Sequence, residues 1–157
     1  MINRMQPSTM PRNARGLGLV EVMVSVLVLA VGLLGIAAMQ SLALRGGQGS
    51  LESTQAVMAT NSILEAIRAN RAAADNYNIA KTCNAASIVG SDVRANDQRA
   101  WVTALKSTIG VAGDATTCGQ IANCDDGNAT NCTITVFWDD SRAGGSTTRT
   151  LSVESQI

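Results

Sequence analysis

Residues 21–39 read EVMVSVLVLAVGLLGIAAM, and this stretch decides the fold because its apolar run is much longer than a strand. The 18 residues from Val22 to Met39 contain no charged side chain. As a helix with a rise of about 1.5 Å per residue they extend about 27 Å, close to the apolar thickness of a bilayer. Gly32 and Gly35 interrupt the run, and small residues in a membrane helix often permit close packing of a second helix. The stretch therefore predicts a membrane-spanning helix.

The residues before the span are basic. The first 16 residues contain Arg4, Arg12 and Arg15 and no acidic residue. Basic flanks stay on the cytoplasmic side, so we expect the N-terminus in the cytoplasm and the rest of the chain outside the cytoplasmic membrane. We accordingly divide the chain into a leader at residues 1–16, a transmembrane half of the first helix at residues 17–43 and an exported domain at residues 44–157.

An ordinary secretory signal peptide is the alternative interpretation of this N-terminus. It would combine the basic start and the apolar run with cleavage at small residues such as those at 41–43, Ser-Leu-Ala. Two features disfavour it. The run exceeds the 7–15 residues typical of a signal-peptide core, and the acidic Glu21 opens the run.

The helical pattern continues beyond the membrane. Leu44, Leu51 and Met58 recur every seven residues. A neighbouring stripe at helical spacing is formed by Val57, Leu64 and Ile67. The pattern is lost from Asn70 onward, which predicts one helix from about Leu17 to about Ala69 with an amphipathic second half. Three glycines, Gly46, Gly47 and Gly49, weaken the junction by about 1 kcal/mol each relative to alanine.

All four cysteines lie in the second half of the chain, at Cys83, Cys118, Cys124 and Cys132. An even number of cysteines in a small exported domain indicates a disulfide framework. The spacings between the last three do not match the short Cys-x2–4-Cys hook of zinc sites. We therefore expect two disulfides, and the three possible pairings remain open.

The composition argues against several classes of function. The chain has no histidine, which removes the commonest neutral-pH acid–base group and metal ligand. Outside the leader there are 12 − 3 = 9 basic and 12 acidic residues, so no basic surface for nucleic acid is indicated. Asp125 to Asn128 lacks EF-hand spacing and is better explained as a turn between cysteines. The Asp139–Asp140 pair is interpreted as solvated. We expect a protein of assembly and not an enzyme, without a metal site or cofactor.

The exported half is expected to combine one helix with a small sheet. Residues 97–109 are predicted to form a short amphipathic helix that has Asn96 or Asp97 as its N-cap and buries Trp101. The partners of Trp101 on its face are Ala100, Ala104, Leu105 and Ile109. Residues 133–138 and 148–153 alternate as the two strands of a hairpin, and a third strand lies near residues 87–93. The predicted class is α+β, with a long N-terminal helix packed on a small antiparallel sheet.

The residues directly before the span carry a family resemblance. Gly16-Leu17-Gly18-Leu19-Val20-Glu21 resembles the prepilin signature, in which a glycine precedes the new N-terminus and a glutamate lies at mature position five. The chain is most similar to the V-type minor pilins of type IV pili, the type IV pilus modification proteins. Residues 21–35, Asp97…Trp101 and residues 134–139 also match that subgroup. Leu17 departs from the pattern, because phenylalanine is commonest at that position.

The resemblance implies a pathway for the chain. Prepilin peptidase would cut between Gly16 and Leu17, and Leu17 would be N-methylated. Glu21 would then pair with the amine of an adjacent subunit in the membrane. The implied protein is a minor pilin that assembles or primes type IV pili and supports pilus-dependent motility or adhesion. It would be anchored once in the inner membrane with its C-terminal domain in the periplasm, and would enter the extracellular pilus after assembly.

The partners implied are other minor pilins, the major pilin, the inner-membrane assembly machinery and membrane lipid, without nucleic acid. Two alternatives remain open at this point. A minor pseudopilin of a type II secretion system would share the leader and Glu21. A soluble secreted binding domain would instead be released by signal peptidase and would not begin at Leu17.

Overall fold

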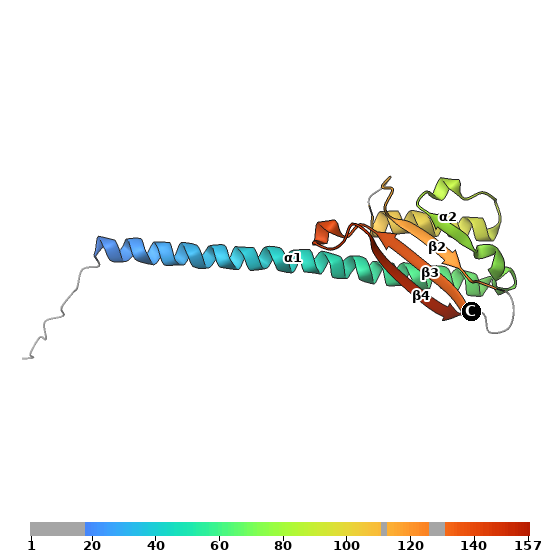
Figure 1. The fold of residues 1–157 in the computed structure, drawn as a ribbon, viewed down its shortest axis with the longest axis horizontal. Coiled ribbons are helices and arrows are strands. Elements are labelled where there is room, and N and C mark those ends of the chain that lie inside the picture. Colours follow the sequence, from blue (N-terminus) through green and yellow to red (C-terminus); the bar gives the residue numbers. More distant parts are fainter. Residues whose placement is uncertain (1–17, 111–112, 126–130) are drawn as a thin grey trace, which may run out of the picture. The chain divides into compact units, whose positions relative to one another are not determined.

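The computed structural model describes residues 18–110, 113–125 and 131–157. These residues divide into two compact units, one ending at Gln40 and one comprising Ser41–Ile157. A single helix, α1 (Leu19–Ala69), contributes to both (Figure 1). The predicted helix end at Ala69 is confirmed, whereas the predicted start at Leu17 lies outside the described residues.

The part of α1 in the first unit has apolar side chains on all sides. The large hydrophobic residues from Leu19 to Met39 are all exposed. An 18-residue window of this helix has a mean hydropathy of 2.7, and none of that window is buried. Among the described residues, α1 is the one helix long and apolar enough to cross a membrane. A helix that is apolar all round needs an apolar environment, which a bilayer supplies.

The second unit contains a four-stranded antiparallel sheet with the order β1-β2-β3-β4. Its strands are β1 (Ile79–Thr82), β2 (Cys118–Ala122), β3 (Asn131–Trp138) and β4 (Arg149–Gln156). The hairpin of β3 and β4 pairs Ile134 with Val153 and Val136 with Leu151. The predicted hairpin is therefore confirmed. The predicted α+β class, a long N-terminal helix packed on a small antiparallel sheet, is confirmed as well.

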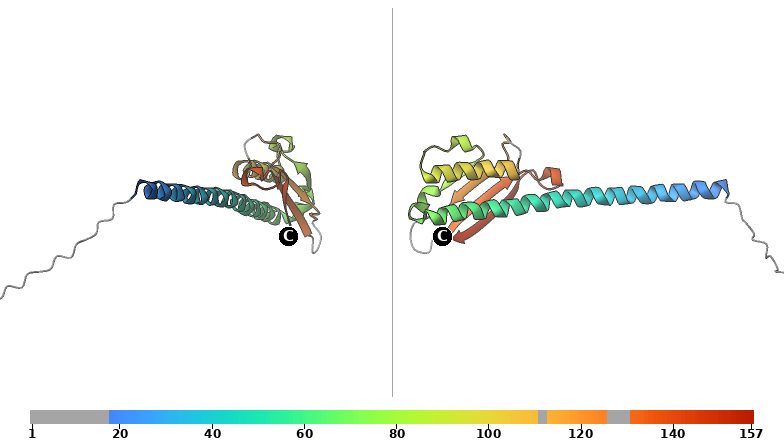
Figure 2. Two further views of the ribbon diagram at one scale, coloured as in Figure 1. Left: turned by 60° about the vertical axis from the view of Figure 1, so that its left-hand side comes forward. Right: turned by 180° about the vertical axis from the view of Figure 1, so that it is seen from behind.

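Two helices lie side by side against the sheet (Figures 1 and 2). Helix α2 (Val93–Thr108) runs along the C-terminal part of α1, and the indole N–H of Trp101 donates to the carbonyl of Ala59 at 3.0 Å. The core between the helices and the sheet includes the following buried side chains: Ala56, Ile63, Leu64, Ile67, Trp101, Val102, Leu105, Ile121, Ile134, Val136 and Trp138.

Helix α2 corrects the predicted helix at residues 97–109. It begins four residues earlier, and Asp92 occupies the N-cap position instead of Asn96 or Asp97. The buried stripe contains Gln98, whose amide donates to the carbonyl of Tyr77 at 2.8 Å. The missed first turn exposes Val93 and buries only the small Ala95, so it carries little hydrophobic pattern. Trp101 is buried as predicted, but the expected Ala100 and Ala104 are exposed.

The predicted strand at residues 87–93 is wrong. Residues Ala85–Ser87 form a 3-10 turn, and Val93 already belongs to α2. The additional strands are β1 and β2, neither of which was predicted. Both are short, and β2 buries the adjacent residues Cys118 and Gly119, so it lacks the strict alternation that identifies a half-buried strand.

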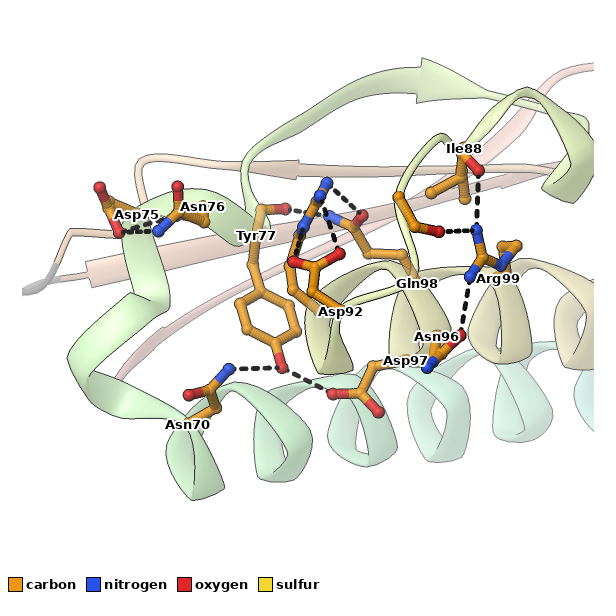
Figure 3. A network of polar contacts seen from close by, with 12 residues as sticks. Asn70, Asp75, Asn76, Tyr77, Ile88, Asp92, Asn96, Asp97, Gln98 and Arg99 are labelled. Atoms are coloured by element: carbon orange, nitrogen blue, oxygen red, sulfur yellow. Dashed lines mark hydrogen bonds and ion pairs between the residues drawn. The ribbon is translucent and has the colours of Figure 1, made fainter.

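A polar network fastens the end of α1 to α2 (Figure 3). The helix is followed by the 3-10 segment Arg71–Tyr77, whose last residue is fully buried. The hydroxyl of Tyr77 donates to Asp97 Oδ2 at 2.6 Å and accepts from the amide of Asn70 at 3.4 Å. These contacts explain why Asp97 lies inside α2 and not at its cap.

Candidate functional site

The predicted assembly site is at the start of α1. Glu21 lies in the first turn, where its backbone N–H donates to the carbonyl of Gly18 at 2.9 Å. A carboxylate at this position is favoured by the positive end of the helix dipole. Glu21 is the only charged residue between Gly18 and Leu44 in the sequence. The predicted cleavage and methylation residues, Gly16 and Leu17, lie outside the described residues.

The other polar or small residues of the span have different surroundings. The hydroxyl of Ser25 donates to the carbonyl of Val22 at 2.8 Å, so its hydrogen-bonding requirement is met within the helix. A Cβ atom placed on Gly32 or Gly35 would have no atom within 4 Å. Neither glycine is therefore required by packing within this chain, and both leave room beside the helix.

The four cysteines form the two disulfides expected from the sequence. Cys83 pairs with Cys118, and Cys124 pairs with Cys132. The first bond ties the residue after β1 to the start of β2, and the second ties the loop after β2 to β3. Asn78 adds a polar clamp to this end of the sheet, because its side chain bonds both the N–H and the carbonyl of Cys124, at 3.0 and 2.7 Å.

A hollow of about 720 Å³ lies beside the first disulfide, between the segment around Cys83 and α2. Its two cationic side chains are already engaged. The ammonium of Lys81 lies 4.1 Å from the centre of the Phe137 ring, and the ammonium of Lys106 bonds the backbone carbonyl of Asp114. Its lining thus offers no unpaired lysine for an anionic ligand.

Sequence reasoning missed a buried charged cluster in the second unit. It consists of Glu52 on α1, Trp138 at the end of β3, Asp140 and Arg142 in the β3–β4 loop, and Arg149 at the start of β4; we call it the Glu52–Asp140 cluster. Asp140 is 2% exposed, which corrects the expectation that the Asp139–Asp140 pair is solvated. The guanidinium of Arg149 binds the carboxylate of Asp140 and lies 5.6 Å from the Trp138 ring.

Gly49 lies where α1 contacts this cluster. It is buried, and a Cβ atom there would lie 3.3 Å from both Asp140 Oδ1 and the Cβ of Ala143. At Gly46 and Gly47 a Cβ atom would meet nothing within 4 Å. Of these three glycines, only Gly49 lies in contact with the β3–β4 loop.

Within the part of the chain that the structure describes, no three histidine, cysteine or acidic residues are placed to hold a metal ion. Of the turn predicted at residues 125–128, only Asp125 is described.

Comparison with known protein families identifies the N-terminal segment. The model of the prokaryotic N-terminal methylation motif matches residues 11–37. The match includes Gly16, Leu17 and Glu21 together with most of the apolar run. No curated protein and no solved structure matches the chain significantly. The motif, together with a long N-terminal apolar helix packed on a small antiparallel sheet, supports a type IV pilin-like protein, a class that includes pilins and pseudopilins.

Proposed function

We propose that this chain is a minor pilin, a structural subunit that takes part in assembling or priming type IV pili. The position of Glu21 supports a pilin-like subunit, and the resemblance of residues 21–35 and 134–139 to the V-type minor pilins favours a pilus over a secretion system. Glu21 lies in the first turn of an apolar helix, inside the segment that matches the methylation motif. Before assembly the protein is anchored once in the inner membrane, with its N-terminus in the cytoplasm and its C-terminal unit in the periplasm.

The energetics of Glu21 give it a role between subunits. Burying a charged carboxylate at the centre of a membrane helix costs about 2.5–3.5 kcal/mol on insertion scales, and less near the interface. Cleavage after Gly16 creates an amine at Leu17, four residues before Glu21. Four residues correspond to about 6 Å of helix. The amine of one subunit and the carboxylate of its neighbour then compensate each other at the same depth in the membrane.

The proposed partners follow from this arrangement. Prepilin peptidase removes the leader, and Leu17 is N-methylated. The exposed apolar half of α1 contacts lipid before assembly and the helices of other minor pilins and the major pilin after it. The inner-membrane assembly machinery transfers the subunit from the membrane to the pilus. Gly32 and Gly35 leave space for a neighbouring helix to approach closely. The work of the protein is assembly, which requires no cofactor and no catalytic residue.

The first experiment is mass spectrometry of the mature protein from its native host. We expect a chain that begins at N-methylated Leu17. Replacing Gly16 with a bulky residue should leave uncleaved precursor in the membrane. A mature chain that begins at Leu44 would instead show that signal peptidase processes the protein and that the secreted-domain alternative is correct.

The second experiment tests Glu21 directly. Glu21→Ala should be inserted and cleaved normally, because alanine is easier to bury than a carboxylate, but it should enter sheared pili poorly. Glu21→Gln separates charge from hydrogen bonding. Ser25→Ala is the matched control, because that hydroxyl bonds its own helix. If Glu21→Ala protein enters pili at the normal level, with normal pilus numbers, the proposed role of Glu21 is wrong.

A deletion strain separates the pilus from the related secretion machine. Loss of piliation and twitching with intact protein secretion is the result expected for a minor pilin. Loss of secretion with normal pili would assign the chain to a type II secretion system as a minor pseudopilin.

A further inference from the structure

Three buried polar atoms that make no hydrogen bond of normal length and angle gather in the Glu52–Asp140 cluster. They are Glu52 Oε2, Trp138 Nε1 and Asp140 Oδ1, and they are the only such side-chain atoms found among the described residues. Buried polar groups are nearly always satisfied, so each exception calls for an explanation. Here the three exceptions come from α1, the end of β3 and the β3–β4 loop, which meet at this point.

The two carboxyl groups are held unequally. Asp140 is bound by Arg149, and its side chain is enclosed by Gly49 and Gly145, where an added Cβ atom would lie 2.7 Å from Asp140 Cγ. Glu52 has a weaker counter-charge, because Arg142 Nη2 lies 3.6 Å from Glu52 Oε1 and the Arg142 side chain is 57% exposed. The Glu52 side chain itself is only 13% exposed. One carboxylate is thus firmly compensated and the other is not.

We propose that Glu52 and Asp140 share a proton, and that this proton fastens the β3–β4 loop to α1. Glu52 takes the proton from solvent and donates it from Oε2 to Asp140 Oδ1. One proton thereby satisfies two of the three unpartnered atoms and removes one of two neighbouring negative charges. When the proton returns to water, two carboxylates face each other in a buried site and the contact between loop and helix loosens.

The electrostatics agree with this geometry. Burial raises the pKa of Glu52 above its usual range, Arg142 opposes that rise, and the charge and hydrogen bonding of Asp140 add to it. The Trp138 indole lowers the pKa by a smaller amount. The other charged groups facing the pair are Arg149, bound to Asp140, and Arg45 of α1, which lines the same hollow as Asp140 and Arg149. The end of α2 contributes a backbone carbonyl, that of Ile109, which accepts from Arg142 at 3.4 Å.

The direction of the pH effect follows from the raised pKa. A carboxyl group whose folded-state pKa exceeds its unfolded value stabilises the fold fully at a pH below the unfolded value. That contribution is lost as the pH rises through the folded-state value. The loop should therefore be held more tightly in mildly acidic than in neutral medium, in contrast to the usual behaviour of a paired carboxylate. The inference does not depend on the proposed role in pili.

Hydrogen–deuterium exchange of the full chain in detergent micelles tests the inference. The reporters are the loop amides that bond across the turn, such as Asp140 N–H to the carbonyl of Ser146 at 3.0 Å and Gly145 N–H to the carbonyl of Asp140 at 2.9 Å. After correction for the intrinsic exchange rate, their protection should fall between pH 5 and pH 8. The fall should approach tenfold for each unit by which the pKa of Glu52 is raised.

Two variants make the test specific. Glu52→Gln carries a permanent donor in place of the proton and should give protection that does not change with pH. Glu65→Gln is the control, because Glu65 lies on the same helix with its side chain 70% exposed and should leave the wild-type dependence intact. The proposal is overturned if the wild-type loop shows no dependence, or if Glu52→Gln retains it. It is equally overturned if Glu65→Gln removes the dependence as completely as Glu52→Gln does.

Discussion

Replacing Gly119 with alanine should destabilise the second unit severely, although the side chain added is a single methyl group. Gly119 lies on β2 directly beneath α2. A Cβ atom there would lie 2.5 Å from Trp101 Cη2 and 3.2 Å from Leu105 Cδ1. The first distance is shorter than real Cβ contacts allow, so either the indole or the strand has to move.

The indole is poorly able to move. Its ring is 4% exposed, and its N–H is bonded to the carbonyl of Ala59 on α1. Overpacking of this kind costs about 1–3 kcal/mol. Losing the indole hydrogen bond adds about 0.5–1.5 kcal/mol. We therefore expect a loss of about 2–4 kcal/mol, which lowers the melting temperature by roughly 4–16 °C for a chain of this size.

Thermal unfolding of the full chain in detergent, followed by circular dichroism under oxidising conditions, measures this loss. Gly47→Ala on α1 is the matched control, because its Cβ atom would meet nothing within 4 Å and alanine favours a helix by about 1 kcal/mol. Trp101→Phe shortens the ring, so Gly119→Ala should cost less in that background. A Gly119→Ala protein within about 0.5 kcal/mol of wild type, or one whose cost is unchanged by Trp101→Phe, refutes the packing argument.

Three further predictions concern the disulfides and the buried tyrosine. Thiol labelling of denatured, unreduced protein should find almost no free cysteine, and two or more labelled thiols per chain would contradict the framework. Removing the Cys83–Cys118 disulfide, which spans 35 residues, should lower the free energy of unfolding by about 4 kcal/mol through loop entropy. Removing Cys124–Cys132, which spans eight residues, should lower it by about 2.5 kcal/mol. Urea denaturation of the two double serine variants measures which loss is larger. Tyr77→Phe should cost about 1.5–3 kcal/mol near pH 8, because a hydrogen bond to a carboxylate is lost. Burial, and then the hydrogen bond to that carboxylate, raise the pKa of Tyr77. The contribution of its hydroxyl is therefore complete below the usual tyrosine pKa of about 10 and falls as the pH rises from there through the raised folded-state value. The urea midpoints of wild type and variant should converge over that rise, and a constant difference would count against this assignment.

The elements that sequence reasoning identified are those whose burial follows a simple period. The end of α1 is visible because the stripe through Leu64 and Ile67 stops there, and both residues are buried. Strand β3 is visible because Ile134, Val136 and Trp138 alternate with half-exposed residues. In both cases one side of the element faces the core and the other does not, which is the condition under which periodicity reports structure.

The elements that were missed violate that condition for identifiable reasons. The first turns of α2 bury Ala95 and the polar Gln98, whose amide is satisfied by a carbonyl 21 residues earlier in the chain. Strand β2 buries Gly119, which has no side chain; the Trp101 indole packed against it leaves no space for a Cβ atom. Such positions depend on contacts between distant segments, and a local pattern does not contain them.

The candidate sites divide in the same way. Glu21 could be singled out as a candidate because a lone acid beside a long apolar run is anomalous in the sequence itself. Glu52 and Asp140 could not, because each is an ordinary charged residue in a polar stretch. Their burial arises only when the loop after β3 packs on Gly49, and nothing in either local sequence indicates that contact.

The three glutamates of α1 differ in whether the helix and its neighbours in this chain supply a partner for the carboxylate. Glu65 is paired one turn further along by Arg68 at 2.5 Å, and Glu52 meets Arg142 and Asp140 of the same chain. Glu21 has no such neighbour further along α1, where the first cation is Arg45, 24 residues or about 36 Å of helix away. Once the basic leader is removed, as we propose, compensation has to come from the amine at Leu17, either its own or that of an adjacent subunit. If Glu21 pairs with the amine of its own subunit, Glu21→Ala should leave assembly unaffected. If it pairs with the amine of an adjacent subunit, Glu21→Ala should impair assembly. The amount of processed variant in sheared pili therefore distinguishes pairing within a subunit from pairing between subunits.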